Sequence, residues 1–367
     1  MTSRREFLQS ATAAVVLSPA LQACSSNDDG RYADAVEETW QHSNPAARSA
    51  AAQQRELVRY ATLAPSSHNS QCWKFKLGDG RISILPDRER RCPAVDPDDH
   101  HLYVSLGCAA ENLVLAAEAL GLHGEVGFDP AADAVDVLLT PAAAAVRSAL
   151  FEAIPQRQST RGAYDGRAVA AAELKSLEQA GTGRGVRVVL LTERAQVEQI
   201  IEYITRANTA QLADRAFVAE LKRWIRFNAR EAVTTRDGLF SGSTGNPSLP
   251  RWIGSALMSW FITPASESQK YALQVRSSAG VAVFISEADN EAHWIEVGRC
   301  YQRFALQATA LGIRNAMVNQ PVEVAAVRPH FGALMGAGAG RPDLIVRFGY
   351  GPEMPRSLRR PVELVLV

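Results

Sequence analysis

The chain has 367 residues, of which 47% are hydrophobic, so it is long enough for one large domain or two moderate ones. This composition argues against general disorder. Its 39 basic and 39 acidic residues give a formal net charge of zero, which does not suit a nucleic-acid-binding protein with a basic face. Any site for an anion must therefore be local.

The first 24 residues are typical of an export signal. The stretch "SRREFLQ" (3–9) closely resembles a twin-arginine signal, and the apolar stretch after it is too short to span a membrane. Residues 21–24 resemble a lipobox, which would place a lipid on Cys24. The twin-arginine route exports folded proteins, typically with their cofactor already loaded. We therefore expect an exported protein of the periplasm or cell envelope, tethered to the membrane where Cys24 is lipidated.

A polar, poorly patterned stretch at 25–45 predicts a linker, and a first half then spans 46–147. Pro65 stops the first helix of this half, and Gly121 stops its long buried helix. The elements expected in chain order are a helix at 46–63, strands at 72–77 and 81–86, a buried helix at 102–122 and a strand at 134–140.

A second half spans 148–367. Within it, residues 208–275 are rich in glycine, serine and proline and lack a clear pattern, which predicts a lid-like insertion. The other elements expected are helices at 171–180, 193–207 and 293–313, and strands at 186–192, 280–286 and 343–351.

The two halves resemble each other in their long buried helices. The helices at 102–122 and 293–313 both have a glycine near their start and both end at Leu-Gly. This similarity predicts a duplicated unit, so that the chain forms an internal pseudo-dimer. The alternative is a chance similarity between two buried helices rich in alanine and leucine.

Four segments, taken in order, resemble the nitroreductase-like FMN-binding family. They are "APSSHNSQCW" (64–73), "QRQSTRGAY" (156–164), "ALGI…NQPVE" and "RFGYG…RRPVE". Over most of 48–367 they look like the single-chain, Acg-like branch in which two units are fused. The resemblance implies an α+β fold with antiparallel-rich mixed sheets flanked by helices. Cys72 departs from the family, which usually has proline at this position.

The family holds its flavin at a dimer interface, so the resemblance implies one FMN per chain between the two halves, in a functional monomer. The first half would contribute a serine-asparagine loop and the second half an arginine-rich stretch, while a later segment would lie beside the reactive flavin nitrogen. The implied cofactor-binding residues are Pro65, Ser66, Ser67, Asn69, Arg157, Gln158, Ser159, Arg161, Pro321, Val322, Glu323, Arg356 and Arg359.

The chemistry of these residues suits that cofactor. A phosphate needs guanidinium forks and short hydroxyl donors, and Arg157, Ser159 and Arg161 alternate along an extended stretch that aims them to one side. The small groups of the 64–73 loop let a backbone approach the flavin. The alternatives are a turn that only stops the preceding helix, and arginines that form surface ion pairs. We assign no role to His68.

Two other clusters predict less. The run with Asp96, Asp98, Asp99, His100 and His101 lacks the spacing of a calcium loop and is interpreted as a solvated turn, so no metal site is predicted. Besides Cys24, the cysteines are Cys72, Cys92, Cys108 and Cys300; none forms a CxxC pair, and their disulfide state stays open.

The resemblance implies an FMN-dependent oxidoreductase with ping-pong two-electron transfer from a small-molecule donor to a nitro- or quinone-like acceptor. The flavin would carry the chemistry, so no catalytic side chain is predicted. Because NAD(P)H is scarce outside the cytoplasm, the alternative is a flavin-binding or storage protein whose insertion occludes the FMN.

Overall fold

The computed structural model describes residues 19–42 and 49–367, without the side chains of 19–26 and 259–261. The twin-arginine stretch at 3–9 and most of the apolar stretch lie outside the described residues, as does the side chain of Cys24.

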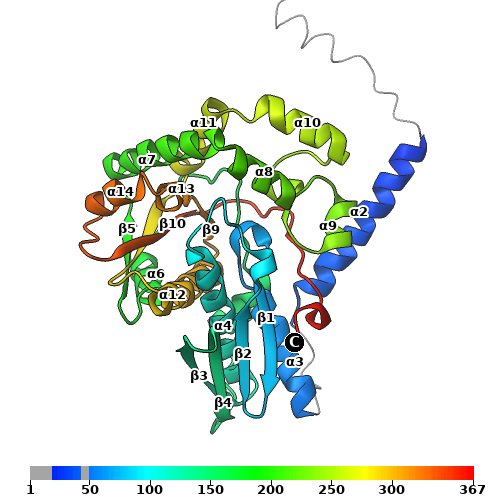
Figure 1. Ribbon diagram of the computed structural model, residues 1–367, viewed down its shortest axis with the longest axis vertical. Coiled ribbons are helices and arrows are strands. Elements are labelled where there is room, and N and C mark those ends of the chain that lie inside the picture. The colour runs from blue at the N-terminus through cyan, green and yellow to red at the C-terminus, as the bar shows by residue number, and fades with distance from the viewer. Residues whose placement is uncertain (1–18, 43–48) are drawn as a thin grey trace, which may run out of the picture.

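The first unit consists of a four-stranded antiparallel sheet with the strand order β1-β2-β4-β3, packed against helices (Figure 1). A tight turn with Gly80 at φ 59° joins its first two strands. Its elements are α3 (Ala50–Thr62), β1 (Trp73–Gly78), β2 (Arg81–Pro86), α4 (His100–Ala119), β3 (Leu122–Asp129) and β4 (Ala134–Pro141).

The second unit repeats this plan, with the strand order β5-β8-β10-β9. In both sheets the first, second, fourth and third strands along the chain lie in that order, with a long helix between the second and third. The elements are α6 (Ala171–Gly181), β5 (Val186–Leu191), β8 (Gly280–Ser286), α12 (Glu291–Ala310), β9 (Arg314–Met317) and β10 (Arg341–Gly349). The predicted α+β class and two tandem units are confirmed.

The helices α4 and α12 cross through a reciprocal pair of glycines. A Cβ atom on Gly107 would lie 2.0 Å from the carbonyl oxygen of Ile295, and one on Gly298 would lie 2.0 Å from that of Val104. Val104 and Ile295 each precede their own glycine by three residues, so the contact has the two-fold character of a homodimer interface. The glycines thus allow the two units to share one hydrophobic core.

The insertion at 208–275 is mostly helical, so the expectation of irregular chain is wrong. It belongs to a longer excursion between β5 and β8, seen at the top of Figure 1. Gly, Ser and Pro segments separate its short helices, which interrupts the apolar periodicity over any longer window. The helices are α7 (Arg194–Ala213), α8 (Arg215–Trp224), α9 (Ala229–Thr235), α10 (Arg251–Phe261) and α11 (Pro264–Arg276).

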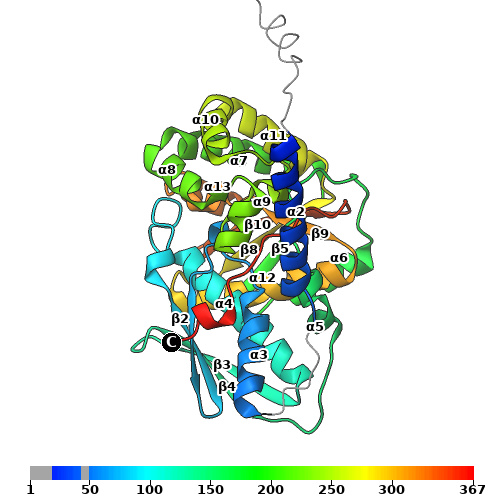
Figure 2. The same cartoon turned by 90° about the vertical axis from the view of Figure 1, so that its right-hand side faces the viewer.

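The predicted linker at 25–45 is also wrong over much of its length, because α2 (Pro19–Thr39) extends through it. Tyr32, Ala35 and Val36 form an apolar stripe at helical spacing that packs against Phe240 and Leu358. Figure 2 shows α2 lying along the body of the molecule beside α9. This stripe is too short to be distinguished from a polar linker in the sequence.

The C-terminal segment of the second unit returns to the first sheet. Phe75 on β1 donates its N–H to the carbonyl of Val365 and accepts from the N–H of Val367. Ser159 likewise pairs in parallel with Asn315 on β9. The C-terminal tail therefore ties the second unit to the sheet of the first, whereas the Ser159–Asn315 pair lies within the second unit.

Among the described residues, α4 is the one helix with the length and hydropathy of a membrane span, and 94% of that window is buried inside the protein, as expected for a core helix. The four described cysteines Cys72, Cys92, Cys108 and Cys300 are buried and free, so none of them forms a disulfide here.

Candidate cofactor pocket at the junction of the two units

The loop between α3 and β1 is held in a strained conformation. His68, Asn69 and Gln71 have φ values of 49°, 53° and 54°, in the left-handed region that residues other than glycine rarely adopt. Such strain persists only where surrounding contacts impose it, and it is common at ligand sites.

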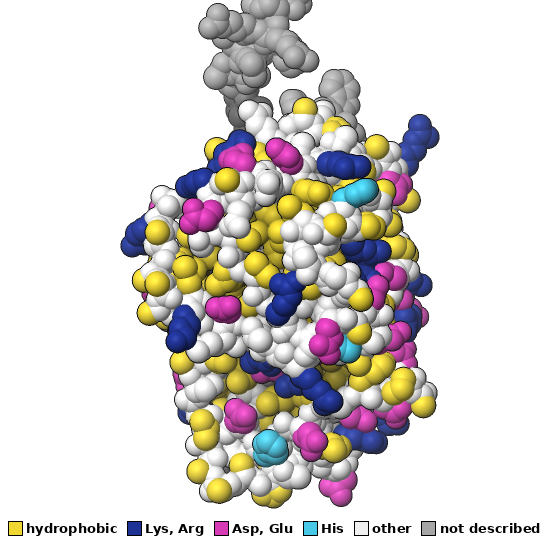
Figure 3. All heavy atoms as spheres, turned by 90° about the vertical axis from the view of Figure 1, so that its left-hand side faces the viewer, with side chains coloured by type: hydrophobic (Ala, Val, Ile, Leu, Met, Phe, Trp, Pro, Cys, Tyr) yellow, Lys and Arg dark blue, Asp and Glu magenta, His cyan; other side chains and the backbone are white. Residues whose placement is uncertain are grey.

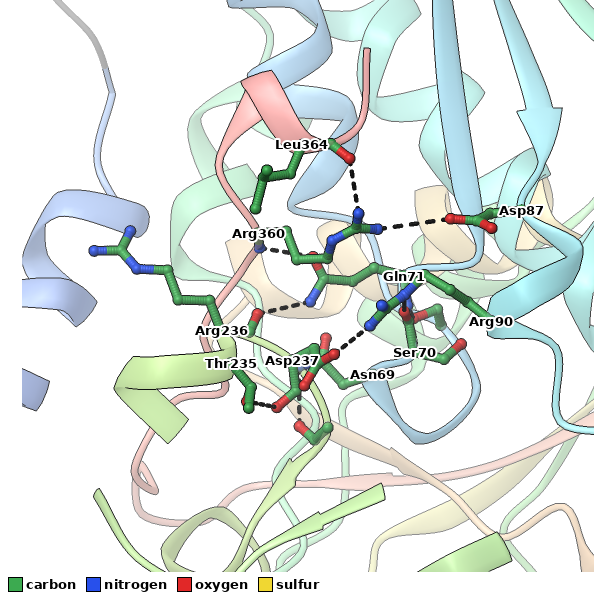
Figure 4. A network of polar contacts seen from close by, with 12 residues as sticks. Asn69, Ser70, Gln71, Asp87, Arg90, Thr235, Arg236, Asp237, Arg360 and Leu364 are labelled. Atoms are coloured by element: carbon green, nitrogen blue, oxygen red, sulfur yellow. Dashed lines mark hydrogen bonds and ion pairs between the residues drawn. The ribbon is translucent and has the colours of Figure 1, made fainter. Parts of the chain in front are cut away.

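The amides of Asn69 and Gln71 fix this loop to the second half of the chain. Asn69 Nδ2 donates to the carbonyls of Gly238 (3.0 Å) and Leu358 (3.1 Å). Gln71 Nε2 donates to the carbonyl of Arg236 at 2.9 Å, and its Oε1 accepts from the Arg360 N–H at 2.8 Å. Figure 4 shows the Gln71 amide between Arg236 and Arg360. The serine-asparagine loop thus reaches the second half, as expected.

A small polar pocket of about 50 Å³ opens between this loop, the 157–161 stretch and the C-terminal tail. None of its described lining residues is acidic. It is lined by Trp40, Pro65, Ser66, Asn69, Arg157, Gln158, Ser159, Arg161, Leu239, Ser243, Pro355, Arg356, Ser357 and Arg359.

Arg157 has unused donors in this pocket. Its side chain is 2% exposed, and its Nη2 donates to the Leu63 carbonyl at 3.1 Å. Its Nε and Nη1 have no hydrogen-bond partner among the described residues. Burial lowers the pKa of the guanidinium. Buried donors without partners are rare and cost about 1–3 kcal/mol each, so Arg157 points to an anion.

Arg359, in contrast, has all its donors engaged. Nε and Nη2 donate to the carbonyls of Thr62, Leu63 and Ala64 at the end of α3, at 2.8, 3.3 and 3.0 Å. Nη1 donates to Asn69 Oδ1 at 2.8 Å and to the Leu358 carbonyl at 3.1 Å. A cation at a helix C-terminus is favourable. Arg359 therefore contributes charge to the pocket and positions Asn69.

Three guanidinium groups surround the indole of Trp40. The Cζ atoms of Arg157, Arg356 and Arg359 lie 5.9, 5.3 and 4.8 Å from its ring centroid. Burial and then the neighbouring arginines lower the pKa of Arg359. The three guanidinium groups therefore repel one another, and a bound anion would relieve this repulsion.

The remaining predicted residues of the stretch have distinct surroundings. Gln158 is paired with the backbone of Met354: its Oε1 accepts the Met354 N–H at 2.9 Å and its Nε2 donates to the Met354 carbonyl. Ser159 is half-buried in the pocket wall beside the Tyr301 hydroxyl. The pKa of Arg161 is lowered by burial.

A second, largely apolar chamber of about 410 Å³ adjoins the pocket. Arg161 and Leu239 line both cavities and therefore lie between them. Leu257 and Met258 of α10 and Tyr271 of α11 contribute to the chamber wall. Charged side chains of both signs are scattered over the face in Figure 3, in keeping with the zero net charge, so the concentration of arginine in the pocket is local.

Four predicted residues do not line the pocket. Ser67 lies in the adjacent turn, and Pro321, Val322 and Glu323 lie in α13 (Gln320–Glu323). Val322 packs in the core of the second unit, and Glu323 accepts from Gln211 Nε2 at 2.6 Å. Burial raises the pKa of Glu323. Their predicted place beside a flavin nitrogen stays a prediction.

Several residues at the site are not among those predicted from the sequence. Gln71 was not singled out, although it is the second amide in the 64–73 loop. Trp40 is the one tryptophan in an otherwise polar N-terminal segment, which was a usable signal. The other missed lining residues are Leu239, Ser243, Pro355 and Ser357.

No protein-family model matches the chain. It is 26% identical over 324 residues to "Putative NAD(P)H nitroreductase Rv3131" of Mycobacterium tuberculosis, covering 85% of this chain and 90% of that protein. It is 24% identical over 327 residues to "Putative NAD(P)H nitroreductase acg" of the same organism, covering 85% and 94%.

Among solved structures, the chain is similar to an FMN-bound nitroreductase from Bacteroides fragilis. The TM-score is 0.35 and the sequence identity is 17%, and the match covers 55% of this chain and 88% of that one. A second, from Desulfovibrio desulfuricans in complex with FMN, has a TM-score of 0.36 and 14% identity, covering 60% and 97%. The two curated relatives confirm the resemblance that the motifs indicate: over 85% of its length the chain is related to proteins named as NAD(P)H nitroreductases.

Proposed function

We propose that this chain is an FMN-dependent, nitroreductase-like oxidoreductase that holds one FMN between its two halves. The observation that carries the proposal is the pocket in which four arginines, four serines and an asparagine meet with no acidic residue among the described lining groups. The loop with Ser66 and Asn69 comes from the first half, and Arg157, Arg356 and Arg359 come from the second. The relatives' names supply the reaction class.

The pocket residues fit the phosphate of FMN. A phosphate monoester carries nearly two negative charges and several acceptor oxygens, which match the unused Nε and Nη1 of buried Arg157. Ser66 Oγ accepts from the Gln71 N–H at 2.9 Å and keeps its own proton to donate. Ser159 and Arg356 supply further donors, while Arg359 adds charge.

When bound, FMN supplies two-electron transfer chemistry. The chain's part is to bind, orient and shield. The arginines fix the phosphate end, and the chamber offers an apolar space next to Arg161 for an aromatic donor or acceptor. Exclusion of water by Leu257, Met258 and Phe227 would protect a transferred hydride from solvent. Donor and acceptor would use this space in turn, in a ping-pong sequence with an NAD(P)H donor and a nitro- or quinone-like acceptor.

One observation favours the alternative, an FMN-holding protein with little turnover. The chamber wall is built by α10 and α11 of the insertion, and α10 packs so closely on Phe227 that a Cβ atom on Gly254 would lie 2.3 Å from that ring. Helices packed in this way would restrict access of a nicotinamide.

We also propose that the protein is exported as a folded monomer and is tethered through Cys24. The sequence at 3–9 and at 21–24 supports this, and the two units already form an internal pseudo-dimer. Metabolic labelling with palmitate, compared between wild type and Cys24→Ala, tests the tether: labelling that persists in the variant contradicts it.

The central experiment measures flavin in the purified full chain. We expect a yellow protein that releases about one FMN per chain on denaturation. Arg157→Gln is expected to weaken FMN binding by about 10- to 100-fold, because charge-assisted hydrogen bonds contribute about 1.5–3 kcal/mol. Arg167→Gln, an exposed arginine outside the pocket, is the matched control. A folded wild type that stays colourless after incubation with FMN contradicts the proposal.

Stopped-flow reduction by NADPH separates the two candidate functions. Rapid bleaching followed by several turnovers with a nitroaromatic or quinone acceptor supports the enzyme. A bound flavin that remains oxidised for minutes supports the storage protein.

A further inference from the structure

The cluster that the sequence analysis interpreted as a solvated turn is buried, so that interpretation is wrong for most of its members. Asp96, His100 and His101 are 4%, 1% and 5% exposed, and Asp99 is buried as well. They become buried because the start of α4 packs against β10 of the second unit, which no local pattern reveals.

Asp96, His100 and His101 converge on one point. Each presents a ligand-type atom, a carboxylate oxygen or an imidazole nitrogen, and these atoms lie within 4.8 Å of one another. Two imidazoles and one carboxylate form a common ligand set for divalent transition metals.

His101 is the independent sign that something is bound there. Neither of its ring nitrogens has a hydrogen-bond partner among the described residues. The ring lies near the Asp343 backbone, and its Nδ1 is 3.8 Å from Asp96 Oδ1, but neither contact has the geometry of a hydrogen bond. A buried imidazole with two unpaired nitrogens is costly, and a metal ion would satisfy one of them.

His100 has the outer partner typical of a metal-binding histidine. Its Nε2 lies 2.9 Å from Asp343 Oδ1, and Asp343 Oδ2 accepts the Ser286 N–H at 2.8 Å. When Nε2 donates to this carboxylate, Nδ1 keeps the lone pair that a metal needs.

The Asp96 carboxylate is held in place by two backbone N–H groups and can still accept further bonds. Oδ1 accepts the N–H of His101 at 2.9 Å and Oδ2 accepts that of Leu102 at 3.0 Å, so each oxygen retains a lone pair. Burial raises the pKa of Asp96 to about 7, which is the behaviour of a carboxylate that lacks a neighbouring cation.

The nearby arginines do not supply that cation. Arg341 Nη1 is paired with Asp98 at 2.8 Å and with Asp289 at 2.9 Å, and Arg328 lies 3.6 Å from Asp98. These pairs offset one another, and the other carboxylates near the two histidines are Asp96, Asp343 and Glu323.

We propose that Asp96, His100 and His101 bind one divalent transition metal, Zn²⁺ or Fe²⁺, that links the start of α4 in the first unit to β10 in the second. The nitrogen ligands disfavour Mg²⁺ and Ca²⁺, which prefer all-oxygen shells. Because the ligand set is closed off from solvent and joined to Asp343 across the unit boundary, the ion stabilises the association of the units. This inference does not depend on the identity of the cofactor.

The test uses tag-free full chain freed of metal with a chelator and titrated with Zn²⁺, and separately with Co²⁺ and with anaerobic Fe²⁺. We expect one tight equivalent per chain, visible d–d absorption for Co²⁺, and a melting temperature that rises by several degrees on loading. His101→Gln is expected to lose the tight equivalent, whereas His123→Gln, an exposed histidine on β3, keeps it. Asp343→Asn should weaken affinity by about 10- to 100-fold.

Circular dichroism establishes that each variant is folded. Asp96→Asn, which keeps one acceptor for the α4 N–H groups, provides a second ligand variant should His101→Gln fail to fold. Two outcomes overturn the proposal: no stoichiometric binding of any of the three ions by the wild type, or equal retention by wild type and the ligand variants.

Discussion

The same connection differs between the two units, and this difference explains why one pocket is expected per chain. In the first unit, the segment between α3 and β1 is the 63–72 loop, with three left-handed residues and two amides that engage the second half. In the second unit, the segment between α6 and β5 is the short 182–185 turn, completed by Gly185 at φ 68°. One copy of the scaffold thus carries the long loop that lines the pocket, while the other carries the helical insertion between its first two strands.

The largest expected effect comes from disturbing the symmetric part of the comparison. Gly107→Ala places a methyl group 2.0 Å from the Ile295 carbonyl, which α4 and α12 can relieve only by moving apart. We expect a loss of about 3 kcal/mol or more in the free energy of unfolding, at the upper end of overpacking costs. Urea denaturation measures this loss.

Gly127→Ala on β3, where nothing lies within 4 Å of the new Cβ atom, is the control and should change stability by less than about 1 kcal/mol. Equal effects of the two substitutions would show that the helices do not meet at this point.

Sequence patterns predicted this symmetric scaffold well, because its strands and long helices carry their own apolar periodicity. The strand expected at 280–286 matches β8, and that at 186–192 matches β5 within a residue. The two glycine-bearing helices also indicated the duplication. Helix α2 and the helices of the insertion were missed, because their apolar stripes are short and acquire meaning only against distant surfaces.

Most residues of the candidate pocket could be predicted from the sequence, but the different contacts that each of them makes could not. Motif resemblance brought Arg157 and Arg359 together, yet it treated them alike. Their difference depends on which carbonyls lie within reach after folding, and Arg359 occupies those at the end of α3. The burial of His100 could not be predicted for the same reason, since Asp343, which contacts it, comes from the other unit.

The second prediction separates these two arginines in the flavin-free protein. Arg359→Gln removes the side-chain donors to the carbonyls of Thr62 and Ala64 and frees Asn69, so we expect a loss of about 3 kcal/mol of stability. Arg157→Gln removes a buried charge with two unpaired donors, so the flavin-free protein should be as stable as the wild type or more stable. Melting temperatures of the two variants provide the measurement, and the same loss in both would contradict the division of labour.

The third prediction concerns the pH dependence of the metal-free protein. Burial raises the pKa of Asp96 from 3.8 to about 7, so the folded state holds this proton more tightly than the unfolded state. The stability from this group is therefore fully present below pH 3.8 and is lost as the pH rises through about 7. Asp343, whose pKa burial also raises to about 7, adds to the same trend.

Urea denaturation of chelator-treated protein at several pH values between 5 and 8 provides the measurement. The stability of Asp96→Asn relative to the wild type should increase with pH over this window and level off above it. A relative stability that does not change with pH would mean that Asp96 titrates normally in the folded protein.

The smallest expected effect tests the attachment of α2. The Tyr32 hydroxyl donates to the Arg356 carbonyl, and Trp40 Nε1 donates to the Ser357 carbonyl at 3.0 Å. Helix α2 and the residue after it therefore hold the C-terminal segment that carries Arg356 and Arg359. Tyr32→Phe removes one partly buried hydrogen bond while keeping the ring against Phe240, and should cost about 0.5–1.5 kcal/mol. Because the change is local to the C-terminal segment, it should accelerate FMN release more than it lowers the melting temperature of the whole protein.

Tyr203→Phe is the control. The Tyr203 hydroxyl donates to the His330 carbonyl at 3.3 Å, outside the pocket, so this variant should leave FMN release unchanged. If both variants release FMN at the wild-type rate, α2 contributes to folding alone, and the first unit's loop with the arginines is sufficient to retain the cofactor.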